Sequence, residues 1–376
     1  MRLCNKRHIF FFLLLVAFPF AVRAQAPASS QQSPSGTQQQ PPLNVDRDPI
    51  VSPDAADNQP VSPSNPNAAG SGIPLEKEKA GFTFRRDVDE VVLNATVLDD
   101  NGRIVNDLKK DDFHVFEDGV PQTIVAFQHQ DLPVSMGILI DNSGSMRDKR
   151  AAVNTAALDL VKASNPQDEA FVVNFSDEAF IDQDFTSNIA KLRDGLAHID
   201  SKGGTALYDA VVASADQLAK GAKRPKQVLL IVTDGEDNAS SLNLEQTIRR
   251  VQDLQGPVVY SIGLLFGDEG GGREAHRAKR ALQLLSNETG GIAYFPKSLE
   301  NVDQICAEVA RDIRNQYTIG YHSTKPASEG GYRIVKVQAA APGHGKLLVR
   351  TRTGYYPKID TKKKNTAEAE KNAPGK

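Results

Sequence analysis

The residues of this chain that could bind a metal ion lie in three short polar segments. Asp141, Ser143 and Ser145 alternate in DNSGS, directly after the apolar run VSMGILI. Thr205 follows two glycines, and Asp234 follows the apolar run QVLLIVT. Together these side chains form an all-oxygen donor set without sulfur or imidazole. Such a set favours Mg²⁺, with Mn²⁺ or Ca²⁺ as alternatives, over zinc or iron.

The segment from residue 132 to 315 alternates strand-like and helix-like patterns. Four apolar runs, VSMGILI, AFVVNFS, QVLLIVTD and VVYSIGLLF, are typical of buried strands. Between them, apolar residues recur at helical spacing, as at Leu207, Val211 and Leu218. This alternation predicts an α/β fold, a doubly wound Rossmann-like domain with a mainly parallel sheet and helices on both faces. Sites in such sheets form beyond the carboxyl ends of the strands, where the polar segments fall.

Two shorter β-rich segments flank this domain. Residues 83–130 contain the alternating run VDEVVLNATVL and a turn signal at Asp118-Gly119, and residues 317–357 contain YTIGYH, GYRIVKVQ and KLLVRTRTGYY. Neither segment alone could cover its apolar face or its strand edges. We therefore predict that the two pair into one small antiparallel β-sandwich-like domain. The α/β domain would be an insertion in it, with both connections at the end opposite the metal.

The two ends of the chain differ in composition from the part predicted to fold. Residues 1–24 have a basic start, a long apolar run and a small residue at the end, which predicts a secretory signal peptide cleaved after Ala24. An uncleaved membrane anchor is the alternative. Residues 25–80 are rich in Gln, Pro and Ser, and residues 358–376 are rich in charge, so both are predicted to be disordered. The protein is expected to be secreted or periplasmic.

Composition and charge narrow the function classes further. The 376 residues, 40% hydrophobic and 24% charged, suffice for one large core or two smaller ones. Without residues 1–24 the net charge falls from −3 to −7, because four basic residues and no acids are removed. An acidic exported protein is a poor candidate for nucleic-acid binding. Cys306 is the one cysteine outside residues 1–24, so no internal disulfide is expected there. We expect Cys306 to be a buried structural thiol.

The three polar segments carry a resemblance to a known family. The α/β unit resembles a von Willebrand factor type A domain, and its polar residues match the metal-ion-dependent adhesion site of that family. The D-x-S-x-S element is Asp141, Ser143 and Ser145, the threonine of the second loop is Thr205, and the aspartate of the third is Asp234. Every position of the motif is filled, and the separated pieces occur in the order that the family requires.

The resemblance extends over about residues 85–357, to a bacterial secreted group described as VWFA-related, on the motifs FEDGVPQ, DLPVSMGILIDNSGSM, GGTALYDA and RNQYTIGY. It implies a protein-binding, adhesion-type module that holds a divalent ion and engages a Glu or Asp of a protein partner. It implies further that Ser143 and Ser145 hold the ion directly and Thr205 directly or through water. Asp141 and Asp234 would act mostly through water.

Other interpretations of the same residues remain open. Each polar segment taken alone could be a helix cap or a turn. Asp141 and Asp234 could activate a water for hydrolysis, but the sequence contains no H-E-x-x-H and no G-x-S-x-G, so the protein is not expected to be an enzyme. A structural role in envelope assembly, with a metal that stabilises the fold, is a third alternative. Glu236 and Asp237 could also supply a second cation site.

Overall fold

The computed structural model describes five segments, which all belong to one compact unit of the chain, Arg47–Lys376. These segments are residues 50–51, 90–163, 165–197, 201–266 and 272–358. The predicted signal peptide lies outside the described residues, as do the predicted spacer, apart from Ile50–Val51, and the tail from residue 359. Within the described segments, no helix is both long and apolar enough to cross a membrane.

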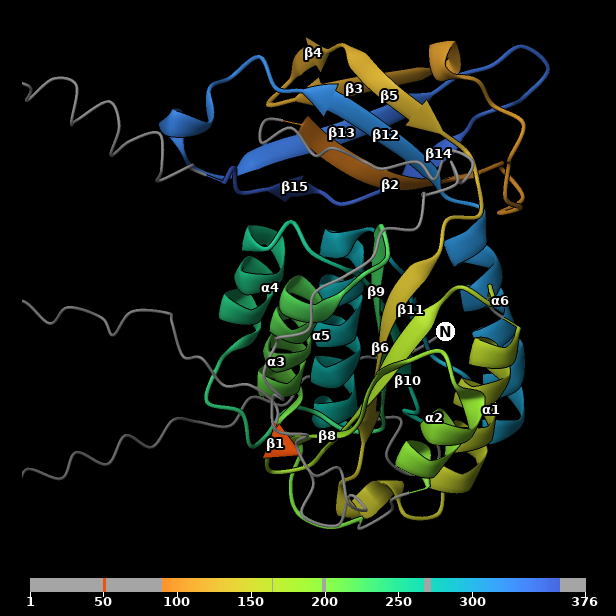
Figure 1. Cartoon of the computed structure of the whole chain (residues 1–376), viewed down its shortest axis with the longest axis vertical. Helices are drawn as coiled ribbons and strands as arrows, with labels where there is room; N and C mark the ends of the chain where they lie inside the picture. Colours follow the sequence, from red (N-terminus) through yellow and green to blue (C-terminus); the bar gives the residue numbers. More distant parts are fainter. Residues whose placement is uncertain (1–49, 52–89, 164, 198–200, 267–271, 359–376) are drawn as a thin grey trace, which may run out of the picture. The chain divides into compact units, whose positions relative to one another are not determined.

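A seven-stranded sheet forms the centre of the α/β domain (Figure 1). Its strands, in spatial order, are β1 (Ile50–Val51), β8 (Ala179–Thr186), β7 (Glu169–Phe175), β6 (Val134–Asp141), β9 (Lys226–Thr233), β10 (Val258–Gly263) and β11 (Ala293–Tyr294). All neighbouring strands run parallel except β7 and β8, which are antiparallel. The strands β6 and β9, which precede two of the polar segments, are therefore direct neighbours.

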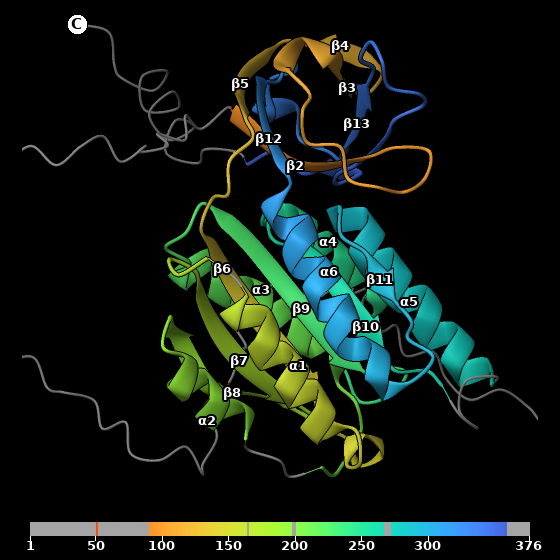
Figure 2. The same ribbon diagram turned by 90° about the vertical axis from the view of Figure 1, so that its right-hand side faces the viewer.

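Helices cover both faces of this sheet (Figures 1 and 2). One face packs against α1 (Arg150–Lys162), α2 (Ile189–Leu196) and α6 (Val302–Arg314). The other packs against α3 (Leu207–Gly221), α4 (Leu244–Asp253) and α5 (Arg273–Thr289). Alternate residues of β6 point to opposite faces of the sheet. Ile138 and Ile140 pack in the hydrophobic core under α1, α2 and α6, and Leu139 packs in the core under α3, α4 and α5. Burial on both sides explains why this strand is a continuous apolar run.

Close packing fixes the central strand that ends at Asp141. Every residue of β6 is buried. At Gly137 a β-carbon would lie 2.5 Å from the Phe171 ring and 2.6 Å from the Leu229 side chain, so a larger residue would overlap both neighbours. The strand therefore holds its carboxyl end in a defined place in the sheet.

Two four-stranded antiparallel sheets form the β-sandwich. One has the order β14 (Leu348–Arg350), β2 (Glu90–Leu98), β12 (Tyr317–His322) and β5 (Ile124–Gln128), and the other β15 (Gly354–Tyr355), β13 (Arg333–Ala339), β3 (Phe113–Glu117) and β4 (Val120–Gln122). Each sheet joins a strand before the α/β domain to one after it, as in the pairs Leu93 with Ile319 and Val115 with Val337. The predicted fold class, a Rossmann-like α/β domain with a small antiparallel β-sandwich, is confirmed.

The two connections between the domains lie side by side. The carboxylate of Asp131, just before β6, lies 4.0 Å from the Arg314 guanidinium at the end of α6. The rings of His129 and Tyr317 stack at 4.4 Å between centroids. Since β6 starts at this end and finishes at Asp141, the sandwich joins the α/β domain at the end of the strand remote from the polar segments.

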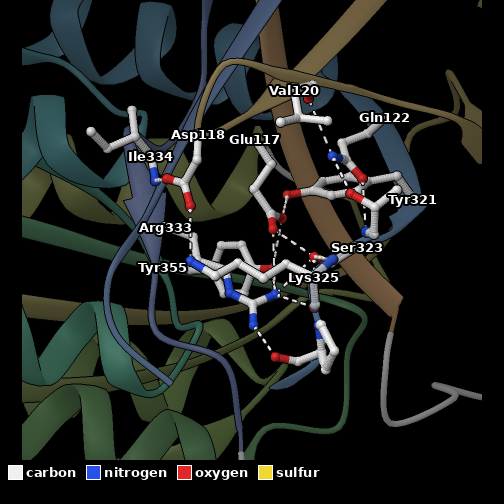
Figure 3. A network of polar contacts seen from close by, with 12 residues as sticks. Glu117, Asp118, Val120, Gln122, Tyr321, Ser323, Lys325, Arg333, Ile334 and Tyr355 are labelled. Atoms are coloured by element: carbon white, nitrogen blue, oxygen red, sulfur yellow. Dashed lines mark hydrogen bonds and ion pairs between the residues drawn. The ribbon is translucent and has the colours of Figure 1, made fainter. Parts of the chain in front are cut away.

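A buried polar network ties the sandwich sheets together (Figure 3). The Glu117 carboxylate on β3 lies 3.3 Å from the Arg333 guanidinium on β13, and both side chains are almost completely buried. The hydroxyls of Tyr321 and Tyr355 donate to Glu117 at 2.8 and 2.9 Å, and that of Ser323 donates at 2.5 Å. A buried charge pair of this kind depends on every partner being present.

Candidate metal centre

The carboxyl ends of β6 and β9 bring two of the polar segments together. These strands pair in parallel with Ile140 beside Val232, so Asp141 and Thr233 end the strands next to each other. After Asp141 the chain turns through a short 3₁₀ helix, η2 (Gly144–Met146), before α1. The D-x-S-x-S segment therefore folds back over the edge of the sheet, against the residue that follows β9.

The side chains of Ser143, Ser145 and Asp234 form a continuous hydrogen-bonded chain. The two serine hydroxyl oxygens lie 3.2 Å apart, and Ser145 donates to Asp234 Oδ1 at 2.8 Å. Ser143 and Asp234 are buried, whereas Ser145 is exposed. Three oxygen donors that are up to 91 sequence positions apart thus converge at one point of the sheet edge.

Asp141 supports this chain from beneath. Its side chain is completely buried, and its carboxylate accepts hydrogen bonds from the Ser143 backbone N–H at 2.8 Å and from the Thr233 hydroxyl at 2.5 Å. Burial raises the pKa of the Asp141 carboxyl to about 6, while the hydrogen bonds from Thr233 and Ser143 act in the opposite direction. Asp141 therefore fixes the position of the serine loop and adds a negative charge below it.

Thr205 lies on the second polar segment, two residues before the start of α3. Its backbone N–H donates to Asn238 Oδ1 at 2.8 Å, and the preceding Gly204 N–H donates to Asp177 Oδ1 at 2.7 Å. Gly235 follows Asp234 and has no β-carbon. A β-carbon placed there would lie 3.5 Å from the Thr205 hydroxyl oxygen, so this hydroxyl lies near the backbone next to Asp234. Thr205, Ser145 and Asp234 line one cavity of about 950 Å³. All five predicted residues therefore lie at one edge of the sheet.

Three polar contacts of this region did not follow from the sequence. Lys149 places its ammonium nitrogen 2.6 Å from Asp234 Oδ2. Thr233 holds Asp141, as described above, and Asn238 holds the loop of Thr205. Lys149 is four residues after Ser145, one helical turn away, but nothing in its spacing distinguishes it from an ordinary solvated lysine.

The acidic loop after Asp234 makes a different set of contacts. The Asp237 carboxylate accepts from the Tyr208 backbone N–H at 3.0 Å and from the Ser240 hydroxyl at 2.5 Å. Glu236 pairs with Arg277 on α5 at 2.6 Å. Both carboxylates thus anchor the loop to α3 and α5.

The donor chemistry fits a small hard cation. Hydroxyl and carboxylate oxygens are the ligands that Mg²⁺, Mn²⁺ and Ca²⁺ take in proteins. In the described part of the chain, no group of three or more His, Cys, Asp or Glu side chains is placed to hold a metal ion. The fit therefore rests on the two serines, Thr205 and the two aspartates.

Comparison with known proteins agrees with this architecture. Residues 136–236 match the family model of the von Willebrand factor type A domain, and this range contains all five candidate residues. We assign a von Willebrand factor type A domain to this part of the chain. An uncharacterized protein of Synechocystis sp. is 28% identical over 140 residues, which are 36% of this chain and 33% of the relative. The match thus spans about a third of the relative's length.

Solved structures with similar folds include further proteins of this type. A von Willebrand factor type A protein from Catenulispora acidiphila aligns with a TM-score of 0.42 at 14% identity, covering 68% of this chain and 76% of that one. The vWF domain of the type V pili tip protein Mfa5 from Porphyromonas gingivalis aligns with a TM-score of 0.40 at 12% identity, covering 49% of this chain and 95% of that one.

Proposed function

We propose that this chain is an exported, adhesion-type protein-binding module that holds a divalent cation, Mg²⁺ or alternatively Mn²⁺ or Ca²⁺. In this proposal the protein is not an enzyme. The observation that carries it is the hydrogen-bonded chain of Ser143, Ser145 and Asp234. Ser145 and Asp234 line the same cavity as Thr205. We also propose membership of the secreted VWFA-related group, on the sequence motifs, and location in the periplasm or outside the cell, on the pattern of residues 1–24.

The roles of the five residues follow from their positions. Ser143 and Ser145 present hydroxyl oxygens and would hold the cation directly, while Thr205 would contribute its hydroxyl from the opposite loop. Asp234 supplies charge at the edge of the cavity, and buried Asp141 supplies charge from below. Because both aspartates would act mostly through water, the cation would keep an open coordination position that a further carboxylate could occupy.

The proposed partner is a protein that places a Glu or Asp side chain at this site. The cavity is large enough for a side chain from outside, at about 950 Å³. Its rim carries Arg273 and Arg277 on α5 as well as the acidic residues Glu236 and Glu274. These mixed charges on the rim would select among partners, whereas the carboxylate itself would bind at the site of the cation.

The arrangement of Asp141 favours binding over catalysis. Its side chain is completely buried, and hydrogen bonds from Ser143 and Thr233 occupy its carboxylate. A general base has to reach the proton that it removes, and this carboxylate faces the protein interior. The envelope-assembly alternative differs in one measurable respect: loss of the cation would lower the melting temperature without changing partner binding.

Replacing Ser145 by alanine should weaken Mg²⁺ binding by at least about tenfold, since it removes one oxygen donor from the site. Ser145 is exposed, so the variant should fold normally. Calorimetric titration of the full chain is expected to show saturable one-to-one binding in the wild type. Thr155→Ala, which removes an exposed hydroxyl on α1, should leave the affinity unchanged. Equal affinity in Ser145→Ala and the wild type would refute the assignment of this serine.

A further inference from the structure

Lys149 contacts the candidate metal centre at Asp234. Its ammonium nitrogen lies 2.6 Å from Asp234 Oδ2. The Lys149 side chain is only 16% exposed and that of Asp234 is fully buried. Water and salt therefore screen this pair less than they screen an ion pair on the surface.

The backbone around Lys149 holds it in this position. Lys149 is the N-cap residue of α1; its N–H donates to the Met146 carbonyl at 2.9 Å, and its carbonyl accepts from Val153 at 3.2 Å. The aromatic ring of Phe266 lies 5.8 Å from the ammonium nitrogen, at the end of the segment that follows β10. The ammonium is therefore held between an aromatic ring and a carboxylate, which are both favourable neighbours for a cation.

Both oxygens of Asp234 consequently have a hydrogen-bond donor. Ser145 donates to Oδ1 at 2.8 Å and Lys149 donates to Oδ2 at 2.6 Å. A divalent cation that draws on the charge of Asp234 would have a full positive charge a few Å away. The repulsion between the two would be large, because Asp234 is fully buried and Lys149 is only 16% exposed.

We propose that Lys149 competes with the divalent cation for Asp234 and thereby limits the affinity of the site. This inference rests on the proposed function, since it presupposes cation binding at these residues. For the cation to gain the full charge of Asp234, the ammonium has to release Oδ2 or share it at an energetic cost. The lysine thus acts as a built-in cation that stabilises Asp234 and must be overcome when the divalent ion binds.

The test is calorimetric titration of Mg²⁺ into the full chain and its Lys149→Met variant, which keeps the length of the side chain and removes its charge. The variant is expected to bind Mg²⁺ at least about tenfold more tightly, because one positive charge next to the ion is gone. Its melting temperature in EDTA should fall below that of the wild type, and Mg²⁺ should raise it by more than in the wild type.

Two further variants control for charge and for folding. Lys162→Met removes an exposed lysine of α1 that pairs with Asp159, and it should leave the Mg²⁺ affinity unchanged. Lys149→Gln can still donate a hydrogen bond to Asp234, so it should fold even if the methionine variant does not, and it should also bind Mg²⁺ more tightly.

The outcomes separate this inference from the proposed function. Tighter binding by the Lys149 variants, including binding that the wild type lacks, supports the competition. If the wild type binds Mg²⁺ and the Lys149 variants bind it no more tightly, the competition is overturned and the proposed function stands. No Mg²⁺ binding by any of these proteins in their folded form overturns both.

Discussion

Replacing Asp141 by alanine is expected to weaken Mg²⁺ binding by about 100-fold, the upper range for losing a group that orients metal ligands. Two effects add up in this variant. The carboxylate that fixes the Ser143 backbone and accepts from Thr233 is lost, so the serine loop is no longer held in place. The buried negative charge below the site is lost as well. Calorimetric titration of the full chain with Mg²⁺ measures the change.

The matched control removes an acid that lies away from the site. Asp159 on α1 is half exposed and pairs with Lys162, so Asp159→Ala changes the net charge by the same amount. Its Mg²⁺ affinity should equal that of the wild type. The melting temperature of each variant shows whether it is folded. A folded Asp141→Ala protein with wild-type affinity would contradict the role of Asp141.

Replacing Glu117 by alanine should lower the free energy of unfolding by about 3–5 kcal/mol, as expected when one member of a buried charge pair is removed. The guanidinium of Arg333, 1% exposed, would then be buried without its carboxylate. The hydroxyls of Tyr321 and Tyr355 would lose their common acceptor (Figure 3). Urea denaturation followed by circular dichroism measures the difference.

An ion pair in the same part of the sandwich provides the control. Lys325 pairs with Asp118 at 3.4 Å, and its side chain is 39% exposed. Lys325→Ala keeps the backbone carbonyl that accepts from Arg333, and it should cost no more than about 1 kcal/mol. If both variants lost the same small amount of stability, the Glu117 network would not have the strength that its burial implies.

The parts of the fold that follow from local pattern could be predicted from the sequence. The short, mostly apolar run VSMGILI predicts a buried strand, and every residue of β6 is buried. Alternation in VDEVVLNATVL predicts the half-buried β2. Pairing of Leu93 with Ile319 follows less directly, from the physical need to cover two exposed apolar faces. Asp141, Ser143 and Ser145 could be proposed as site residues because D-x-S-x-S has fixed spacing and follows a strand, whereas Thr205 and Asp234 depended on the family resemblance.

Contacts between remote positions could not be predicted in this way. Glu117 and Arg333 are 216 positions apart, and neither belongs to a motif that would pair them. Lys149 stands in an ordinary charged stretch, and its contact with Asp234 depends on the turn after η2. Residues Ile50–Val51 lie within the predicted spacer, yet they form β1 beside β8, a pairing that two residues are too few to signal.

Anomalous X-ray diffraction from crystals of the full chain grown with Mn²⁺ would locate the cation. We expect one strong manganese peak at the carboxyl edge of β6 and β9, about 2.0–2.6 Å from the hydroxyl oxygens of Ser143 and Ser145. Such a peak would place the cation on the predicted residues. A manganese peak at the loop of Glu236 and Asp237, with none beside the two serines, would contradict the claim.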